Sequence, residues 1–101
     1  MIERTGNGLQ VSGDVTIATV SALFKEGLKL SQNGAAGSSL VIDFAQLGKV
    51  DSSAVSLMLA WMREAQRSNA QMQFANVPEN LFSLANLYGV AEIILPKHQP
   101  L

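Results

Sequence analysis

The chain has 101 residues, of which 48% are apolar and 15% are charged. These values indicate one globular domain, because domains most often have about 100–150 residues and disordered chains are poorer in apolar side chains. The formal net charge of −1 leaves no broad positive field, so nucleic acid is not expected as a partner. The absence of cysteine excludes disulfides, thiolate nucleophiles and zinc–cysteine sites.

The N-terminal segment MIERTGNG lacks the basic and apolar regions of a secretory signal. The longest apolar run, around residues 54–62, is shorter than the roughly 20 residues that a membrane-spanning helix needs. We therefore expect a cytoplasmic protein, whose membrane association would come only through a partner.

The N-terminal half predicts a strand and then a helix. Leu9 and Val11 alternate with polar residues in GLQVSGDV, which is typical of a short strand with one wet face. From Thr16 onward, apolar residues at spacings of three and four predict an amphipathic helix that ends at Asn33-Gly34. Those apolar positions are Ile17, Val20, Leu23, Phe24, Leu28 and Leu30.

The following segments continue this alternation. LVIDF (residues 40–44) is a β-branched apolar run, as expected of a strand in the middle of a sheet or covered on both faces. A helix of about four turns should follow Asp51, then a strand at QMQFANV, a helix from Pro78 to Gly89 and a last strand at AEIILP. With an additional N-terminal strand, this order predicts a single α/β domain with some parallel pairing and a flexible tail at residues 94–101.

The helix after Asp51 has a wide apolar surface. One stripe, which should lie on the sheet, consists of Val55, Met58, Leu59, Met62 and Ala65. A second line of Ala54, Leu57 and Trp61 is more than one-sided burial requires. Leu57 and Trp61 either pack under a neighbouring helix or loop, or form part of a partner-binding surface, where tryptophan is enriched.

Asp51, Ser52 and Ser53 directly precede this helix. Aspartate and serine are preferred at helix starts, where they accept hydrogen bonds from free backbone amides. A hydroxyl at the same place could also carry a phosphate, which the amides and the helix dipole would hold. Capping alone explains these residues, and a regulatory role uses the same geometry.

Catalytic and metal sites are not expected. A serine nucleophile needs a nearby base, and the only histidine is His98 in the tail, which argues against a small hydrolase. One histidine without cysteine does not suggest a zinc site. The spacing of Asp14, Asp43 and Asp51 resembles no metal-binding loop, and no glycine-rich phosphate loop is present. No enzyme activity, cofactor or metal is predicted.

The segments LVIDFAQLGKVDSSAV, MQFANV, NLFSLANLYGV and IILP resemble a STAS domain. The resemblance covers nearly the whole chain. It implies a single domain over residues 1–101, with a mixed sheet of four to five strands and about three helices packed against it.

Within that family the opening LQVSGDVTIATVSALF and the ending LANLYGVAEIILP look most like the stand-alone STAS subunit of the Mla phospholipid-transport ABC system. The resemblance implies a non-catalytic accessory subunit that binds the cytoplasmic ATPase of an ABC transporter, together with its permease. That transporter would maintain the lipid asymmetry of the outer membrane.

The resemblance also implies a site at Ser52. In the Mla subunits the hydroxyl residue after the aspartate contacts the ATPase, and in the anti-sigma factor antagonists the matching serine is phosphorylated. The chain departs from the antagonists at Ala54 and Ser56, where they usually have glycines that leave space for a kinase. An antagonist switched by phosphorylation at Ser52 is therefore the alternative function.

The sequence thus predicts a partner-binding surface, whose residues are Asp51, Ser52, Ser53, Leu57 and Trp61. An exposed Trp61 would also favour a homodimer of the isolated chain, because a contiguous apolar patch usually marks a contact.

Overall fold

The computed structural model describes residues 1–6, 8–31 and 39–94. Its elements in chain order are β1 (Ile2–Arg4), β2 (Gly8–Val15), α1 (Val20–Ser31), β3 (Ser39–Val50), α2 (Ser52–Arg67), β4 (Gln71–Ala75), α3 (Glu79–Leu87) and α4 (Ala91–Ile94). The predicted alternation is confirmed as far as α3, and the additional N-terminal strand is confirmed as β1. The predicted helix end at Asn33-Gly34 and most of the predicted tail lie outside the described residues.

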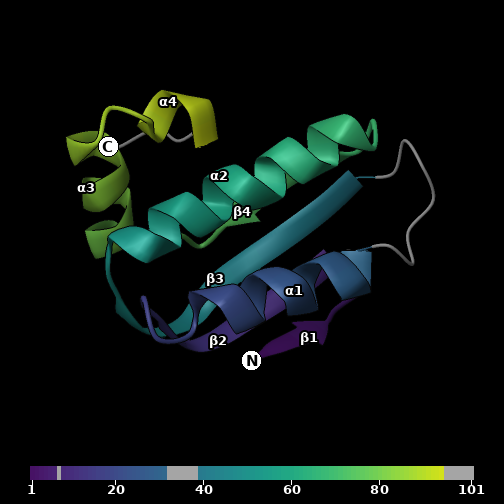
Figure 1. Ribbon diagram of the computed structural model, residues 1–101, viewed down its shortest axis with the longest axis horizontal. Helices are drawn as coiled ribbons and strands as arrows, with labels where there is room; N and C mark the ends of the chain where they lie inside the picture. Colours follow the sequence, from purple (N-terminus) through teal and green to yellow (C-terminus); the bar gives the residue numbers. More distant parts are fainter. Residues whose placement is uncertain (7, 32–38, 95–101) are drawn as a thin grey trace.

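The described strands form one sheet in the order β1-β2-β3-β4. β1 pairs with β2 antiparallel, whereas β2–β3 and β3–β4 are parallel. The prediction that residues 40–44 lie in an interior strand is confirmed, since β3 has a neighbour on each side. Both α1 and α2 lie across one face of the sheet (Figure 1). Because β2, β3 and β4 run parallel, the segments that follow them meet at one edge of the sheet.

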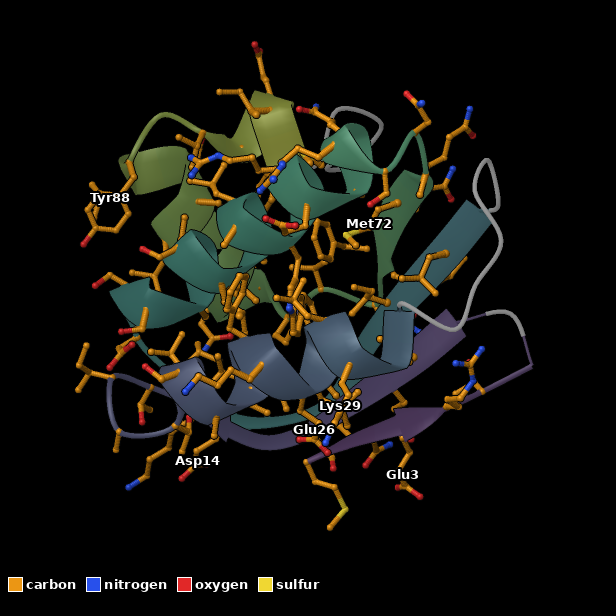
Figure 2. The ribbon with its side chains drawn as sticks, turned by 45° about the vertical axis from the view of Figure 1, so that its right-hand side comes forward. Glu3, Asp14, Glu26, Lys29, Met72 and Tyr88 are labelled. Carbon is orange, nitrogen blue, oxygen red and sulfur yellow. The ribbon has the colours of Figure 1, made fainter. Side chains whose placement is uncertain are left out.

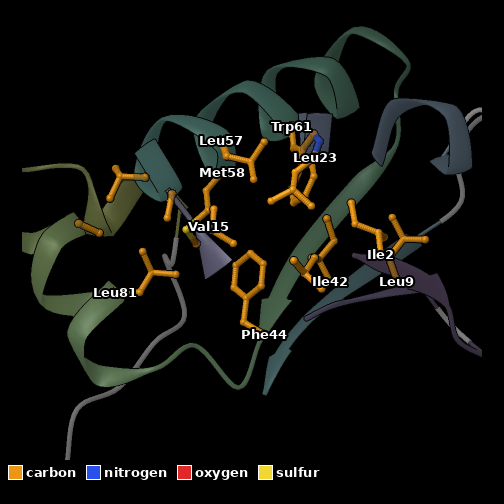
Figure 3. Packing of buried hydrophobic residues seen from close by; sticks show 14 of the residues in the cluster. Ile2, Leu9, Val15, Leu23, Ile42, Phe44, Leu57, Met58, Trp61 and Leu81 are labelled. Carbon is orange, nitrogen blue, oxygen red and sulfur yellow. The ribbon is translucent and has the colours of Figure 1, made fainter. Parts of the chain in front are cut away.

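The core lies between that face and the helices. Leu9 of β2 is in register with Ile42 of β3, and both are buried. Phe44 stacks on Phe74 of β4 with ring centroids 5.5 Å apart. Figure 3 shows Met58 pointing from α2 toward these strands. The stripe predicted to lie on the sheet is confirmed: Val55, Met58 and Ala65 are buried, and Leu59 and Met62 are half-buried against the core.

The opposite face of the sheet is polar. Gln10 is in register with Asp43, which is half-buried, and Gln73 of β4 is exposed. The interpretation that the strand at residues 40–44 is covered on both faces is therefore wrong, because only Leu40, Ile42 and Phe44 face the helices. The apolar run reflects a central position in the sheet.

β3 is longer than the predicted 40–44, because it follows β2 through two register shifts as far as Val50. At the first shift the Asp43 carboxylate accepts hydrogen bonds from the Ala45 amide (2.8 Å) and from the Asn76 side chain (3.1 Å). These bonds, led by the one from Ala45, hold the pKa of Asp43 below its ordinary value. An irregular strand of this kind is stabilised by its own side chain.

The predicted last strand at AEIILP is wrong where the structure describes it, because Ala91–Ile94 form the short helix α4. Gly89, with a φ of 72°, ends α3, and the Ile93 amide then donates to the Val90 carbonyl. Ala91 is buried and Ile93 is 58% exposed. A short apolar run fits either a strand or a helix, and here packing of α4 against α2 and α3 decides for the helix.

Candidate partner-binding surface

Asp51 begins α2. Its backbone is extended, with a φ of −131°, and its Oδ1 accepts a hydrogen bond from the Ser53 amide at 2.8 Å. The capping interpretation is confirmed, with Asp51 and not Ser52 as the capping residue. The Ser52 side chain is exposed and Ser53 is half-buried. Ser52 is thus available at the surface, in the first turn of a helix whose start is already capped.

Asp51 also binds the loop between β2 and α1. Its Oδ2 accepts a hydrogen bond from the Ile17 amide at 3.0 Å, and its own amide donates to the Val15 carbonyl at 3.2 Å. One carboxylate therefore joins two segments that are more than 30 residues apart in the sequence. The start of α2 and residues 16–19 form one continuous surface.

Asp14 and Thr19 add further bonds to this loop. The Asp14 Oδ1 accepts from the Lys49 amide at 2.8 Å, and the Thr19 hydroxyl donates to the Asp14 carbonyl at 2.9 Å. Thr19 Oγ1 also accepts from the Thr16 amide at 3.0 Å. A Cβ at Gly48 would collide with the Asp14 carboxylate and would displace it from its hydrogen bond with the Lys49 amide. Figure 2 shows Asp14 near the end of the molecule where α2 begins.

Ile17 was predicted within the apolar stripe of the first helix, and that prediction is wrong. Residues 16–19 form a turn, in which the Thr16 carbonyl accepts from the amides of Thr19 and Val20, so α1 begins only at Val20. Ile17 is 79% exposed as a result. The two threonines flanking the turn are the sequence signal that was missed, because hydroxyl side chains often bond to nearby backbone at helix starts.

The structure excludes Leu57 and Trp61 from the exposed surface. Each is 2% exposed and belongs to the hydrophobic core, and Figure 3 shows both pointing inward from α2. The Trp61 indole donates to the Phe24 carbonyl of α1 at 3.4 Å. A Cβ at Gly27 would lie 2.6 Å from Trp61, so this glycine makes room for the indole. Packing under a neighbouring helix is the correct interpretation, and an exposed Trp61 cannot drive self-association.

The hydrogen bonds to Asp51 predict an acid-sensitive element. The hydrogen bond from the Ile17 amide is the largest effect and holds the pKa of Asp51 below its ordinary value of 3.8. Desolvation, the next largest effect, opposes it, and the amide and hydroxyl of Ser53 lower the pKa further. A carboxyl whose pKa is lowered by folding contributes stability that is present above its unfolded pKa and is lost as the pH falls through its folded pKa. The melting temperature of the wild-type chain should therefore decrease as the pH is lowered below about 4.

The variant Asp51→Asn should lose part of this acid dependence, because an amide does not titrate and can accept only at its oxygen. Thermal unfolding followed by circular dichroism between pH 7 and pH 3 measures the difference. At pH 7 the melting temperature of Asp51→Asn should be lower than that of wild type. The difference between the two melting temperatures should become smaller toward pH 3. Glu92→Gln, an exposed carboxylate on α4, is the control. An unchanged difference across the range would contradict the role of Asp51.

Two kinds of feature are absent from the described residues. None of their helices is long and apolar enough to cross a membrane. Within the same part of the chain, no three His, Cys, Asp or Glu side chains are placed to hold a metal ion. His98, on which the hydrolase alternative depends, lies outside the described residues.

The fold is that of STAS-like α/β proteins. A solved structure described as the anti-sigma factor antagonist SpoIIAA in its unphosphorylated form matches with a TM-score of 0.69 and 19% identity, covering 90% of this chain and 81% of that one. A crystal structure of Mglu matches with a TM-score of 0.59 and 17% identity over 80% of this chain, which corresponds to 20% of that chain. At these identities the matches show the fold alone.

The family follows from the sequence comparison. Residues 1–96 match the family model described as Mlab, STAS domain. The chain therefore belongs to this STAS family. No curated protein matches it.

Proposed function

We propose that this chain is a non-catalytic accessory subunit of an ABC phospholipid transporter. It binds the cytoplasmic ATPase subunit, supports the ATPase cycle and so helps to maintain lipid asymmetry of the outer membrane. The match of residues 1–96 to the Mlab STAS family is the observation that carries the proposal. Its association with the inner membrane is through the ATPase and its permease.

The proposed contact surface is the start of α2 with the loop that Asp51 binds. Ser52 and Ser56 are both exposed, and residues four apart lie on one side of a helix. Asp51 contributes by fixing the arrangement, since its two oxygens accept from the Ser53 and Ile17 amides. Leu57 and Trp61 contribute only indirectly, because they are buried in the core and fix the position of α2.

The alternative is an anti-sigma factor antagonist switched by phosphorylation at Ser52. The exposed Ser52 hydroxyl and the fold of the unphosphorylated SpoIIAA structure favour it. The Asp51 carboxylate argues against this alternative for two reasons. It already accepts a hydrogen bond from the Ser53 amide, which a phosphate on Ser52 would need, and its negative charge would repel that of the phosphate. A constitutive contact leaves the hydrogen bond between Asp51 and the Ser53 amide in place.

Affinity purification of the tagged chain from native membrane extract tests the proposal. We expect mass spectrometry to identify an ABC ATPase together with its permease, in similar amounts to the tagged chain. The same preparation should hydrolyse ATP at a rate that falls when the tagged chain is removed. An unrelated tagged domain of similar size is the control.

Two results would overturn the proposal. Recovery of a soluble serine kinase, with a phosphate on Ser52 after incubation with ATP, would favour the antagonist. Failure of purified chain and purified ABC ATPase to bind each other would exclude the accessory-subunit function.

A further inference from the structure

We infer that Ile17 is the anchor of the partner contact and inserts into an apolar pocket of the ATPase subunit. This inference rests on the proposed function and identifies the residue that contributes most of the binding energy. Ile17 lies in the loop between β2 and α1, where it is 79% exposed. An isoleucine so exposed contributes little to the core of the chain itself.

The loop holds Ile17 in a fixed position. The Ile17 amide is bound by Asp51, and the neighbouring turn is closed by the Thr19 hydroxyl, which bonds to both Asp14 and Thr16. The Asp51 amide binds the loop once more through the Val15 carbonyl. A side chain on a pre-ordered loop loses little conformational entropy on binding, which is the property of an effective anchor.

The surroundings of Ile17 identify the kind of partner. Ala18, Ser52 and Ser56 are exposed and uncharged, which suits the surface around an apolar pocket. Two carboxylates lie at this surface: that of Asp51 accepts from the Ile17 amide, and that of Asp14, at the end of β2, accepts from the Lys49 amide.

These charges also argue against two other occupants. A symmetric contact between two copies at this surface would bring the Asp14 and Asp51 carboxylates of both copies together, and like charges in a contact repel each other. An anionic lipid surface would be repelled in the same way, and a single isoleucine is too small an apolar anchor for stable membrane binding. A protein pocket with an uncharged edge fits the exposed, uncharged residues around Ile17.

The inference is tested by calorimetry, which measures the binding of purified variants to the purified ABC ATPase. Ile17→Asp should weaken binding by about 100-fold or more, since anchors of this type dominate an interface. Ile17→Ala should weaken it by about tenfold, because it removes apolar area without adding a charge. The matched control is Ile93→Asp, which places the same charge on another exposed isoleucine at 58% exposure. The control should bind like wild type.

The outcomes separate the two hypotheses. If wild type binds the ATPase and Ile17→Asp binds equally well, the anchor is elsewhere and the accessory function stands. If wild type does not bind the ATPase, the accessory function and this inference both fail. Circular dichroism should give the same melting temperature for Ile17→Asp and wild type. If Ile17→Asp instead abolished self-association in sedimentation experiments, the occupant would be a second copy and the inference would be wrong.

Discussion

Replacing Trp61 with alanine should lower the free energy of unfolding by about 3–5 kcal/mol, the usual cost of removing a buried tryptophan or phenylalanine. The indole is 2% exposed and lies between α2 and α1, where it fills the space that Gly27 leaves open. Its loss leaves a cavity and removes the hydrogen bond to the Phe24 carbonyl. For a domain of this size, the melting temperature should fall by more than about 10 °C.

Urea denaturation followed by circular dichroism measures this effect, because the variant has no tryptophan whose fluorescence could be followed. Tyr88→Ala is the control, since this aromatic side chain is 54% exposed and should change stability by less than about 0.5 kcal/mol. Equal stability of the two variants would mean that Trp61 is not in the core. Loss of partner binding without loss of stability would instead support the exposed surface that the sequence predicted.

Ser52→Asp should weaken binding to the ATPase by about 2–4 kcal/mol, a factor of about 30 or more, because a carboxylate would be buried in the contact without a partner. The free chain should barely change in stability. Ser52 is exposed, and an acidic residue in the first turn of a helix interacts favourably with the helix dipole. The neighbouring Asp51 carboxylate offsets part of that gain.

Calorimetry with the purified ATPase measures binding, and thermal unfolding measures stability. Ser52→Ala is the matched control: it removes the hydroxyl without adding a charge and should keep most of the affinity. Wild-type affinity of Ser52→Asp would place the contact away from the start of α2. If cells that carry Ser52→Ala kept normal lipid asymmetry of the outer membrane, this result would also argue against regulation by phosphorylation.

The start of α2 could be predicted well because its signals are local. Asp51 and the serines after it mark a helix start, and the side chain of Asp51 forms the cap within three residues of sequence. The stripe from Val55 to Ala65 repeats at helical spacing and does pack into the core. The order of strands and helices as far as α3 followed from similar local patterns.

The exposure of individual apolar side chains could not be predicted in the same way. Spacing marks Ile17, Leu57 and Trp61 equally as apolar positions on helices, yet one is exposed and two are buried. The difference arises from distant residues. Asp51 holds Ile17 in a turn outside α1, and Gly27 on α1 provides the space that Trp61 occupies.

The sequence by itself determined the class of fold, the family and the position of the capped helix start. These depend on periodicity, turn residues and short motifs, which are properties of neighbouring residues. Only the tertiary structure decided which apolar side chains are exposed and whether Ala91–Ile94 form a strand or a helix. Both depend on what packs against a segment, and the packing partners come from elsewhere in the chain.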